Sequence, residues 1–153
     1  SWGEASFGTS GDDPMPSDDH SPTVTTPELV LAVNAGGGAY IATDGTVYEA
    51  DTYGVARTWY NPVPIAGTED DTLYQTETVD LNGFTYDIAL ADGTYQVALH
   101  FAEIWHGGYR DGVRVFDVQV EDQLLFDDLD IYREVGANTA LVAQHTVEVQ
   151  DGQ

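Results

Sequence analysis

The sequence predicts an all-β domain of the β-sandwich class, and three observations lead to this prediction. Short apolar runs recur along the chain, and in several of them apolar and polar residues alternate with the period of two expected of a half-buried strand. Turn signals containing Gly, Asn and Asp separate these runs. No stretch keeps a helical period for long. Many short strands at regular spacing are typical of a β-sandwich.

The strands predicted in the first half of the chain are bounded by glycine-containing turns. Residues 28–34 form an apolar run that ends at three glycines, 36–38, and residues 47–51 follow a Thr-Asp-Gly turn. Residues 73–79 and 84–90 flank Leu-Asn-Gly, which predicts a hairpin. The three glycines could cradle a phosphate, but neither a helical pattern nor a lysine follows them. We therefore predict a sharp turn with positive φ.

Alternation is clearest in the second half of the chain. An Ala-Asp-Gly turn leads into residues 94–104, and residues 113–121 place Arg114 on the same side as three apolar residues. Residues 123–126 and 139–149 complete the predicted strands. Glu103 is the natural partner of Arg114 if their strands are neighbours. We therefore predict a buried structural ion pair between Arg114 and Glu103, because a buried charge needs a partner.

The first 27 residues differ in composition from the rest. They are rich in Ser, Thr, Asp, Gly and Pro, with prolines at positions 14, 16, 22 and 27. This composition predicts an extended polar arm or linker over residues 1–27, followed by a folded domain over residues 28–153. We expect the arm to lie on its own domain or on a neighbouring molecule. The chain starts with Ser1 rather than Met, which we interpret as a removed leader or a cut fragment.

The charge balance predicts a salt-adapted protein. Among 153 residues, 27 are acidic and 4 are basic, all of them arginine, which gives a net charge of −23. Such a charge destabilises the compact state by self-repulsion at ordinary salt, and concentrated salt screens that repulsion. An ordinary acidic extracellular protein is the alternative. Nucleic-acid binding is not expected, because phosphate recognition needs clustered Lys and Arg.

Several function classes find no support in the residues. The absence of cysteine excludes disulfides, thiolate metal sites and cysteine nucleophiles, and no run is apolar enough to span a membrane. Every serine lies in residues 1–21, and the histidines lack metal-ligand spacing, so we predict neither an enzyme nor a cofactor or metal site. Two minor alternatives remain: a glycosidase pair of Glu77 and Glu103, and a calcium site formed by Asp127, Asp128 and Asp130.

Seven motifs resemble one known family in their order and spacing. They are VNAGG (33–37), EADTYG (49–54), DTLYQTE (71–77), LHFAEI (99–104), RVFDV (114–118), DLDI (128–131) and VGANTA (135–140). Together they resemble the malectin domain family over about residues 31–152. The resemblance implies a jelly-roll-like antiparallel β-sandwich that binds carbohydrate, glucose-containing oligosaccharides in particular, as part of an extracellular protein.

The resemblance also implies a site made of aromatic residues in loops. The family's tyrosine falls on Tyr53, and its aromatic pair falls on Trp105 and His106; we add the nearby Tyr109 as a candidate. Trp59 is expected to pack rather than to bind. This sequence departs from the family in two ways. Thr78 stands where the family has an aromatic residue, and the chain ends at Gln153, before the family's late carboxylate. From this end we also expect the last strand or strands to be lacking.

Two functions remain open. The first is a non-catalytic extracellular module that binds a neutral, glucose-containing glycan through Tyr53, Trp105, His106 and Tyr109. The alternative is a structural subunit of a cell-surface filament, in which the arm of one subunit, residues 1–27, supplies the strand that the next subunit lacks. Threonine and valine at positions 23–26 favour the extended structure that such an exchange requires.

Overall fold

The computed structural model describes residues 27–54 and 56–153, and most of its elements are strands. The strands are β1 (Val33–Asn34), β2 (Tyr40–Ile41), β3 (Val47–Ala50), β4 (Arg57–Tyr60), β5 (Thr76–Val79), β6 (Gly93–Phe101), β7 (Phe116–Val120), β8 (Gln123–Leu129) and β9 (Leu141–Val149). Three short helices interrupt them: α1 (Asp71–Tyr74), the 3₁₀ helix η1 (His106–Gly108) and α2 (Ile131–Val135). The predicted all-β sandwich class is confirmed.

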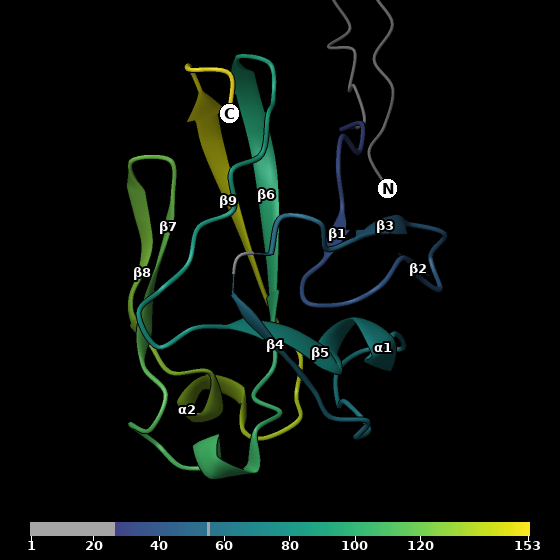
Figure 1. Cartoon of the computed structure of the whole chain (residues 1–153), viewed down its shortest axis with the longest axis vertical. Helices are drawn as coiled ribbons and strands as arrows, with labels where there is room; N and C mark the ends of the chain where they lie inside the picture. Colours follow the sequence, from purple (N-terminus) through teal and green to yellow (C-terminus); the bar gives the residue numbers. More distant parts are fainter. Residues whose placement is uncertain (1–26, 55) are drawn as a thin grey trace, which may run out of the picture.

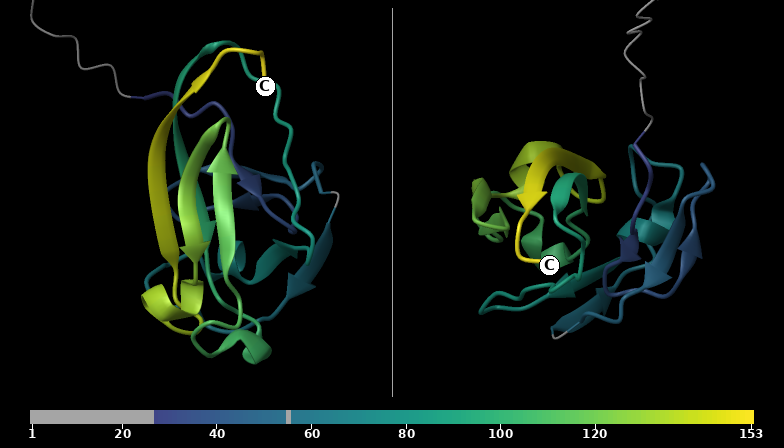
Figure 2. Two further views of the ribbon diagram at one scale, coloured as in Figure 1. Left: turned by 90° about the vertical axis from the view of Figure 1, so that its left-hand side faces the viewer. Right: turned by 90° about the horizontal axis from the view of Figure 1, so that it is seen from above.

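The strands divide into an N-terminal and a C-terminal group (Figures 1 and 2). In the first group, β3 lies between β1 and β2, and β4 pairs antiparallel with β5. In the second group, β6 pairs with β9 and β7 pairs with β8. Figure 2 shows β7, β8 and β9 standing side by side, with the N-terminal strands on the other side of the molecule.

The longest ladder joins β6 to β9 and runs from Gly93 opposite Val149 to Phe101 opposite Leu141. Its inner positions are apolar except for His145, which lies against Phe126, and Val147 and Val149 are buried. Phe101, at the end of β6, packs against Phe116 of β7 and Phe126 of β8. These aromatic contacts join the β6–β9 ladder to the β7–β8 hairpin.

The main apolar cluster lies where β6 ends. It contains the buried Ala102 and Ile104, together with Ile65 and Tyr74, and partly buried residues pack around it: Val63, Leu73 and Ala140. Ile104 has no exposed surface. The chain therefore leaves β6 from a fixed point, and the loop that follows begins at a rigid anchor.

The predicted hairpin around Leu81-Asn82-Gly83 is wrong. Gly83 does turn with φ of 82°, but residues 84–90 follow as extended chain outside any strand ladder, and residues 71–74 form α1. The partner of β5 is β4, with Arg57 opposite Val79 and Tyr60 opposite Thr76. The sequence did not indicate β4, because all its residues are exposed and show no alternation of burial.

The predicted glycine turn is confirmed at Gly36, whose φ is 71°. A Cβ atom there would lie 2.6 Å from the carbonyl oxygen of Glu77, so glycine is needed for close approach as well as for conformation.

The predicted arm falls almost wholly on residues 1–26, which lie outside the described residues, and its boundary stays a prediction. No helix in the described part of the chain is long and apolar enough to cross a membrane.

Candidate functional site

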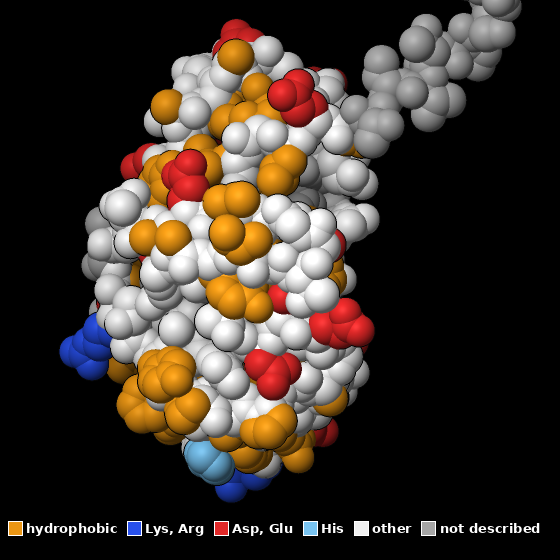
Figure 3. All heavy atoms as spheres, turned by 90° about the vertical axis from the view of Figure 1, so that its right-hand side faces the viewer, with side chains coloured by type: hydrophobic (Ala, Val, Ile, Leu, Met, Phe, Trp, Pro, Cys, Tyr) orange, Lys and Arg blue, Asp and Glu red, His pale blue; other side chains and the backbone are white. Residues whose placement is uncertain are grey.

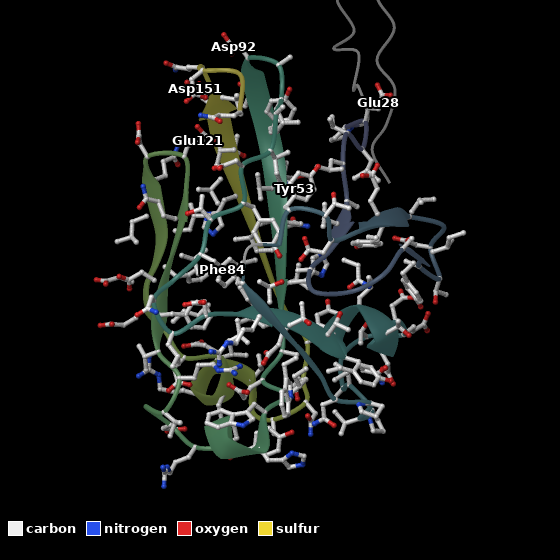
Figure 4. All side chains as sticks on the ribbon, in the orientation of Figure 1. Glu28, Tyr53, Phe84, Asp92, Glu121 and Asp151 are labelled. Carbon is white, nitrogen blue, oxygen red and sulfur yellow. The ribbon has the colours of Figure 1, made fainter. Side chains whose placement is uncertain are left out.

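The four predicted site residues fall into two groups. Trp105, His106 and Tyr109 lie together in the loop that follows β6, at the end of the molecule where η1 lies in Figure 1. Tyr53 lies in the turn after β3 and belongs to a different cluster. Figure 4 shows Tyr53 in the central part of the molecule, away from this end.

The loop of Trp105 is fastened at its start by hydrogen bonds. The side chain of Asn61 donates from Nδ2 to the carbonyl oxygen of Ile104 at 2.7 Å. The backbone N–H of Trp105 donates to Oε1 of Glu103 at 2.9 Å. Between these two bonds the chain has little freedom, yet the Trp105 side chain keeps 41% of its surface exposed.

Arg114 joins two carboxylates beneath this loop. Its Nη1 lies 3.0 Å from Oε2 of Glu77 and 3.2 Å from Oε1 of Glu103, and its Nη2 lies 3.1 Å from Oε1 of Glu77. The predicted pair of Arg114 with Glu103 is confirmed. The structure adds Glu77, which makes the bidentate contact that suits a planar guanidinium. The sequence placed Glu77 on a strand but held no signal of this contact.

The same guanidinium lies over the indole of Trp105, with its Cζ 5.5 Å from the ring centroid. A cation over the face of a tryptophan is attracted to the negative face of the ring. Glu103 therefore helps to position Trp105 in two ways: it accepts a hydrogen bond from the Trp105 backbone, and it binds the arginine that lies over the Trp105 ring. We call Trp105, His106, Tyr109, Arg114, Glu77 and Glu103 the Trp105 cluster.

Glu103 is the most buried charged group of this cluster. Its side chain is 1% exposed, and burial raises its pKa, while the Trp105 N–H and the Arg114 charge act against that rise. Its Oε2 has no hydrogen-bond partner among the described residues. A Cβ atom at Gly108 would lie 2.6 Å from the Glu103 carboxyl carbon, so only glycine fits over this group.

His106 and Tyr109 form the outer part of the cluster. Their rings lie 5.0 Å apart, and Tyr109 stacks on Tyr132 at 6.3 Å with an interplanar angle of 15°. The Tyr109 hydroxyl donates to Oδ1 of Asn138 at 2.7 Å. Tyr109 is thus half-buried and bonded within the protein, whereas His106 is exposed. Of the two, His106 is better placed to meet a ligand.

Tyr53 belongs to a second cluster centred on Asp51, which we call the Asp51 cluster: Asp51, Tyr53, Thr78, Phe84 and Tyr86. The ring of Tyr86 lies 6.1 Å from that of Tyr53 and 5.7 Å from that of Phe84. Tyr53 and Phe84 are both labelled in Figure 4. Thr78, the position at which the family resemblance expects an aromatic residue, bonds to both Asp51 and the Tyr86 hydroxyl.

Asp51 accepts a hydrogen bond from each side of this cluster. Its Oδ2 accepts from the Gly36 N–H at 2.7 Å, the Tyr86 hydroxyl at 2.8 Å and the Thr78 hydroxyl at 3.1 Å, and its Oδ1 accepts from the Tyr53 N–H at 3.0 Å. Burial on its own would raise the pKa of Asp51, but these donors outweigh it and lower the pKa. Burial raises the pKa of Tyr86 to about 12.

The two clusters lie on opposite faces of β5. Glu77 points toward Arg114, and Thr78 points toward Asp51. Successive residues of a strand project to opposite faces. The structure therefore brings Trp105, His106 and Tyr109 together but does not join Tyr53 to them.

The three residues of the alternative calcium site do not come together as a set. Asp130 is not part of a calcium site with Asp127 and Asp128, because its carboxylate accepts from the N–H groups of Gly112 and Arg133 and caps α2. The carboxylates that gather instead within 4.8 Å belong to Asp117, Asp127 and Asp128, all exposed. Exposed clusters of this kind are expected in so acidic a chain.

A hollow of about 310 Å³ lies at the far end of the molecule, near the tips of β7–β8 and β9, where Figure 4 labels Glu121 and Asp151. Its lining consists of carboxylate and amide side chains: Glu121, Asp122, Gln123, Glu148, Gln150 and Asp151. It has no aromatic wall on which a sugar could stack. On the face that Figure 3 shows, acidic side chains are scattered among apolar ones from top to bottom, and apolar side chains lie beside a histidine at the lower end.

Comparison with known proteins identifies relatives over most of the chain. The model of the malectin domain family matches residues 29–153. Malectin-A of Xenopus laevis is 36% identical over 120 residues, which cover 74% of this chain and 43% of that protein. Malectin of Homo sapiens is 35% identical over 122 residues, covering 74% and 41%. The chain thus spans less than half the length of these relatives.

A solved structure, that of a Bacteroides uniformis β-glucuronidase, has a similar fold. The TM-score is 0.68 at 20% sequence identity, and the match covers 80% of this chain and 15% of that one. At this identity the likeness concerns the fold of one part of a larger enzyme.

Proposed function

This chain belongs to the malectin domain family, and on that premise we propose that it is a non-catalytic carbohydrate-binding module whose ligand contacts the Trp105 cluster. The observation that carries the proposal is the indole of Trp105, which lies against the Arg114 guanidinium while the residue stays 41% exposed. The C–H faces of a sugar ring pack on such an aromatic surface, while its hydroxyls find polar partners nearby. His106, exposed beside Trp105, is such a partner.

The charges of the cluster favour a neutral glycan. Arg114 carries one positive charge against the two carboxylates of Glu77 and Glu103, and the protein as a whole has a net charge of −23. A sugar acid or sulfate would approach against this field, whereas a neutral sugar would not. The family resemblance makes glucose-containing oligosaccharides the first glycans to test.

A non-catalytic role is consistent with the state of the two carboxylates. Glycoside hydrolysis requires two carboxyl groups that reach the scissile bond from either side. Here Glu77 and Glu103 both bond to the same arginine, and Glu103 is 1% exposed. A glycan bound over Trp105 would therefore be held rather than cleaved.

The setting that we propose for this module is outside the cell or on its surface, in concentrated salt. The support is the acidic composition without lysine, which keeps a protein soluble where electrostatic repulsion is screened. Stacking and neutral hydrogen bonds are insensitive to screening, so the proposed ligand contacts would operate at such salt.

The test is titration calorimetry against neutral glucose oligosaccharides at about 0.1 M and about 2 M NaCl, where the Debye length differs several-fold. We expect binding at both salts, and a loss of affinity of about tenfold or more in Trp105→Ala, because removing a stacking aromatic costs about 1.4 kcal/mol or more. Phe84→Ala is the matched control, since it removes an exposed aromatic side chain from the Asp51 cluster. Equal losses in both variants, or no binding by the wild type, would contradict the proposal.

A further inference from the structure

We propose that Trp59 of β4 is a second stacking surface of the same site, so that the ligand is a neutral glycan of at least two sugar residues lying across Arg114 and Glu77. This inference rests on the proposed function. It assigns a ligand role to a tryptophan that the sequence predicted to pack. Trp59 keeps 46% of its surface exposed, slightly more than Trp105.

The register of β4 and β5 places Trp59 on the face of the Trp105 cluster. Trp59 is directly opposite Glu77 in the antiparallel ladder, and residues opposite one another in a ladder project to the same face. Glu77 on that face bonds to Arg114. The indole of Trp59 therefore lies beside Glu77 at one end of the ion pair, and Trp105 lies against Arg114 at the other end.

The loop of Trp105 is bonded to the chain that continues from β4. Asn61, two residues after Trp59, donates its side-chain hydrogen bond to the carbonyl oxygen of Ile104, the residue before Trp105. Because side chains two positions apart in extended chain project to the same side, this bond fixes the loop on the side where Trp59 lies. Two exposed indoles from distant parts of the sequence thus flank one ion pair.

The ion pair between the indoles is not fully covered. The side chain of Arg114 is 22% exposed and that of Glu77 is 16% exposed. A guanidinium has five N–H donors. The bonds to Glu77 and Glu103 account for three of them, and among the described residues the other two have no protein acceptor. Ring and linkage oxygens of a sugar are acceptors of the right kind.

The spacing implied by this arrangement sets the minimum size of the ligand. The rings of Trp59 and Trp105 do not form an aromatic pair among the described residues, and the Arg114 guanidinium lies over the Trp105 ring, 5.5 Å from its centroid. One sugar ring can therefore stack on only one indole at a time. Use of both indoles requires two sugar residues joined across Arg114 and Glu77.

The experiment compares glucose with neutral glucose disaccharides, maltose and cellobiose among them, by titration calorimetry of the whole chain. The wild type is expected to bind a disaccharide about tenfold or more tighter than glucose. Trp59→Ala is expected to remove that gain, so that the variant binds a disaccharide no more tightly than glucose, and Trp105→Ala is expected to weaken both ligands. Tyr60→Ala is the control, because Tyr60 is the next residue of β4, is exposed, and projects to the opposite face.

The outcomes separate this inference from the proposed function. A disaccharide gain that survives in Trp59→Ala while Trp105→Ala loses binding overturns the role of Trp59 alone. A wild type that binds no glycan overturns both. If Trp59→Ala proves misfolded by circular dichroism, Trp59→Leu and Trp59→Phe replace it, and the gain is then expected to be lost in the first and partly kept in the second, which retains an aromatic ring.

Discussion

The Trp105 cluster and the Asp51 cluster are built from the same kinds of residue and lie on the two faces of one strand, yet they differ in how their polar groups are used. In the Asp51 cluster, the hydroxyls of Thr78 and Tyr86 bond to Asp51 and to each other, and Asp51 accepts four hydrogen bonds. In the Trp105 cluster, Oε2 of Glu103 and two N–H groups of Arg114 lack partners in the described part of the chain. The Asp51 cluster thus resembles a structural joint, a set of bonds that holds separate segments of the chain together. The Trp105 cluster resembles a site that is completed by a ligand.

The two central carboxylates show the difference in their pKa values. Burial dominates at Glu103 and raises its pKa, whereas hydrogen bonds outweigh burial at Asp51 and lower its pKa. A carboxylate whose pKa falls on folding stabilises the fold when it is ionised, and one whose pKa rises does the reverse. Aromatic residues near a carboxylate are therefore not enough to predict a sugar site. The two clusters differ in whether the donors and acceptors around the carboxylate are already bonded within the protein.

The strongest test of the Asp51 cluster as a structural joint is Gly36→Ala. An alanine there would have to adopt φ of 71° and place its Cβ atom 2.6 Å from the carbonyl oxygen of Glu77. We expect a loss of about 2 to 4 kcal/mol in the free energy of unfolding, measured by urea denaturation. Gly38→Ala is the matched control, since its Cβ atom would meet nothing within 4 Å. Similar stability in both variants would contradict the close approach.

A smaller effect is expected from Asp51→Asn, which keeps one acceptor oxygen and removes the charge. We expect a loss of about 1.5 to 3 kcal/mol near pH 7, because hydrogen bonds to a charged acceptor are lost or weakened. The pKa of Asp51 is lowered in the fold, so its contribution is present above the unfolded value of 3.8 and disappears as the pH falls through the folded value. The stability difference between the wild type and the variant should shrink in acid. A difference that stays constant with pH would argue against a stabilising role of the ionised Asp51 carboxylate.

The smallest effect, with the opposite pH dependence, is expected from Glu103→Gln. The pKa of Glu103 is raised in the fold, so the stability that its protonated form contributes is full below the unfolded value of 4.5 and is lost as the pH rises through the folded value. Arg114 keeps its bidentate contact with Glu77 in the variant. We therefore expect a change of about 1 kcal/mol or less at pH 7, with the stability difference shifting in favour of the variant as the pH rises from the unfolded value of 4.5 through the raised folded value. A shift in the same direction as that of Asp51→Asn would remove the contrast between the clusters.

Some of this arrangement follows from local sequence signals. The alternation in residues 113–121 placed Arg114 on the same side as the apolar residues of the predicted strand, and the position of Glu103 at the end of an apolar strand made their ion pair predictable. The glycines after β1 predicted the turn with positive φ. In each case the information lies in a few consecutive residues, because a strand period or a backbone conformation is a local property.

Other features could not be read from local patterns. Residues 84–90 alternate like a strand but remain outside the ladders, and β4 shows no alternation yet pairs with β5. Tyr53 and Trp105 match positions of one family, but the structure assigns them to different clusters. Strand pairing depends on which segments meet after the chain has folded, so it is not written in the periodicity of either segment.

The all-β class, the relationship to the malectin domain family, the high negative charge and the pairing of Arg114 with Glu103 can all be predicted from the amino-acid sequence. Which aromatic residues share a surface depends on how the strands pair in the folded chain. The register of β4 against β5 sets Trp59 beside Glu77, and the alternation of β5 turns Glu77 and Thr78 toward different clusters. A shift of β4 by one residue in that register would place Trp59 on the face of Thr78, because neighbouring side chains of a strand face opposite ways.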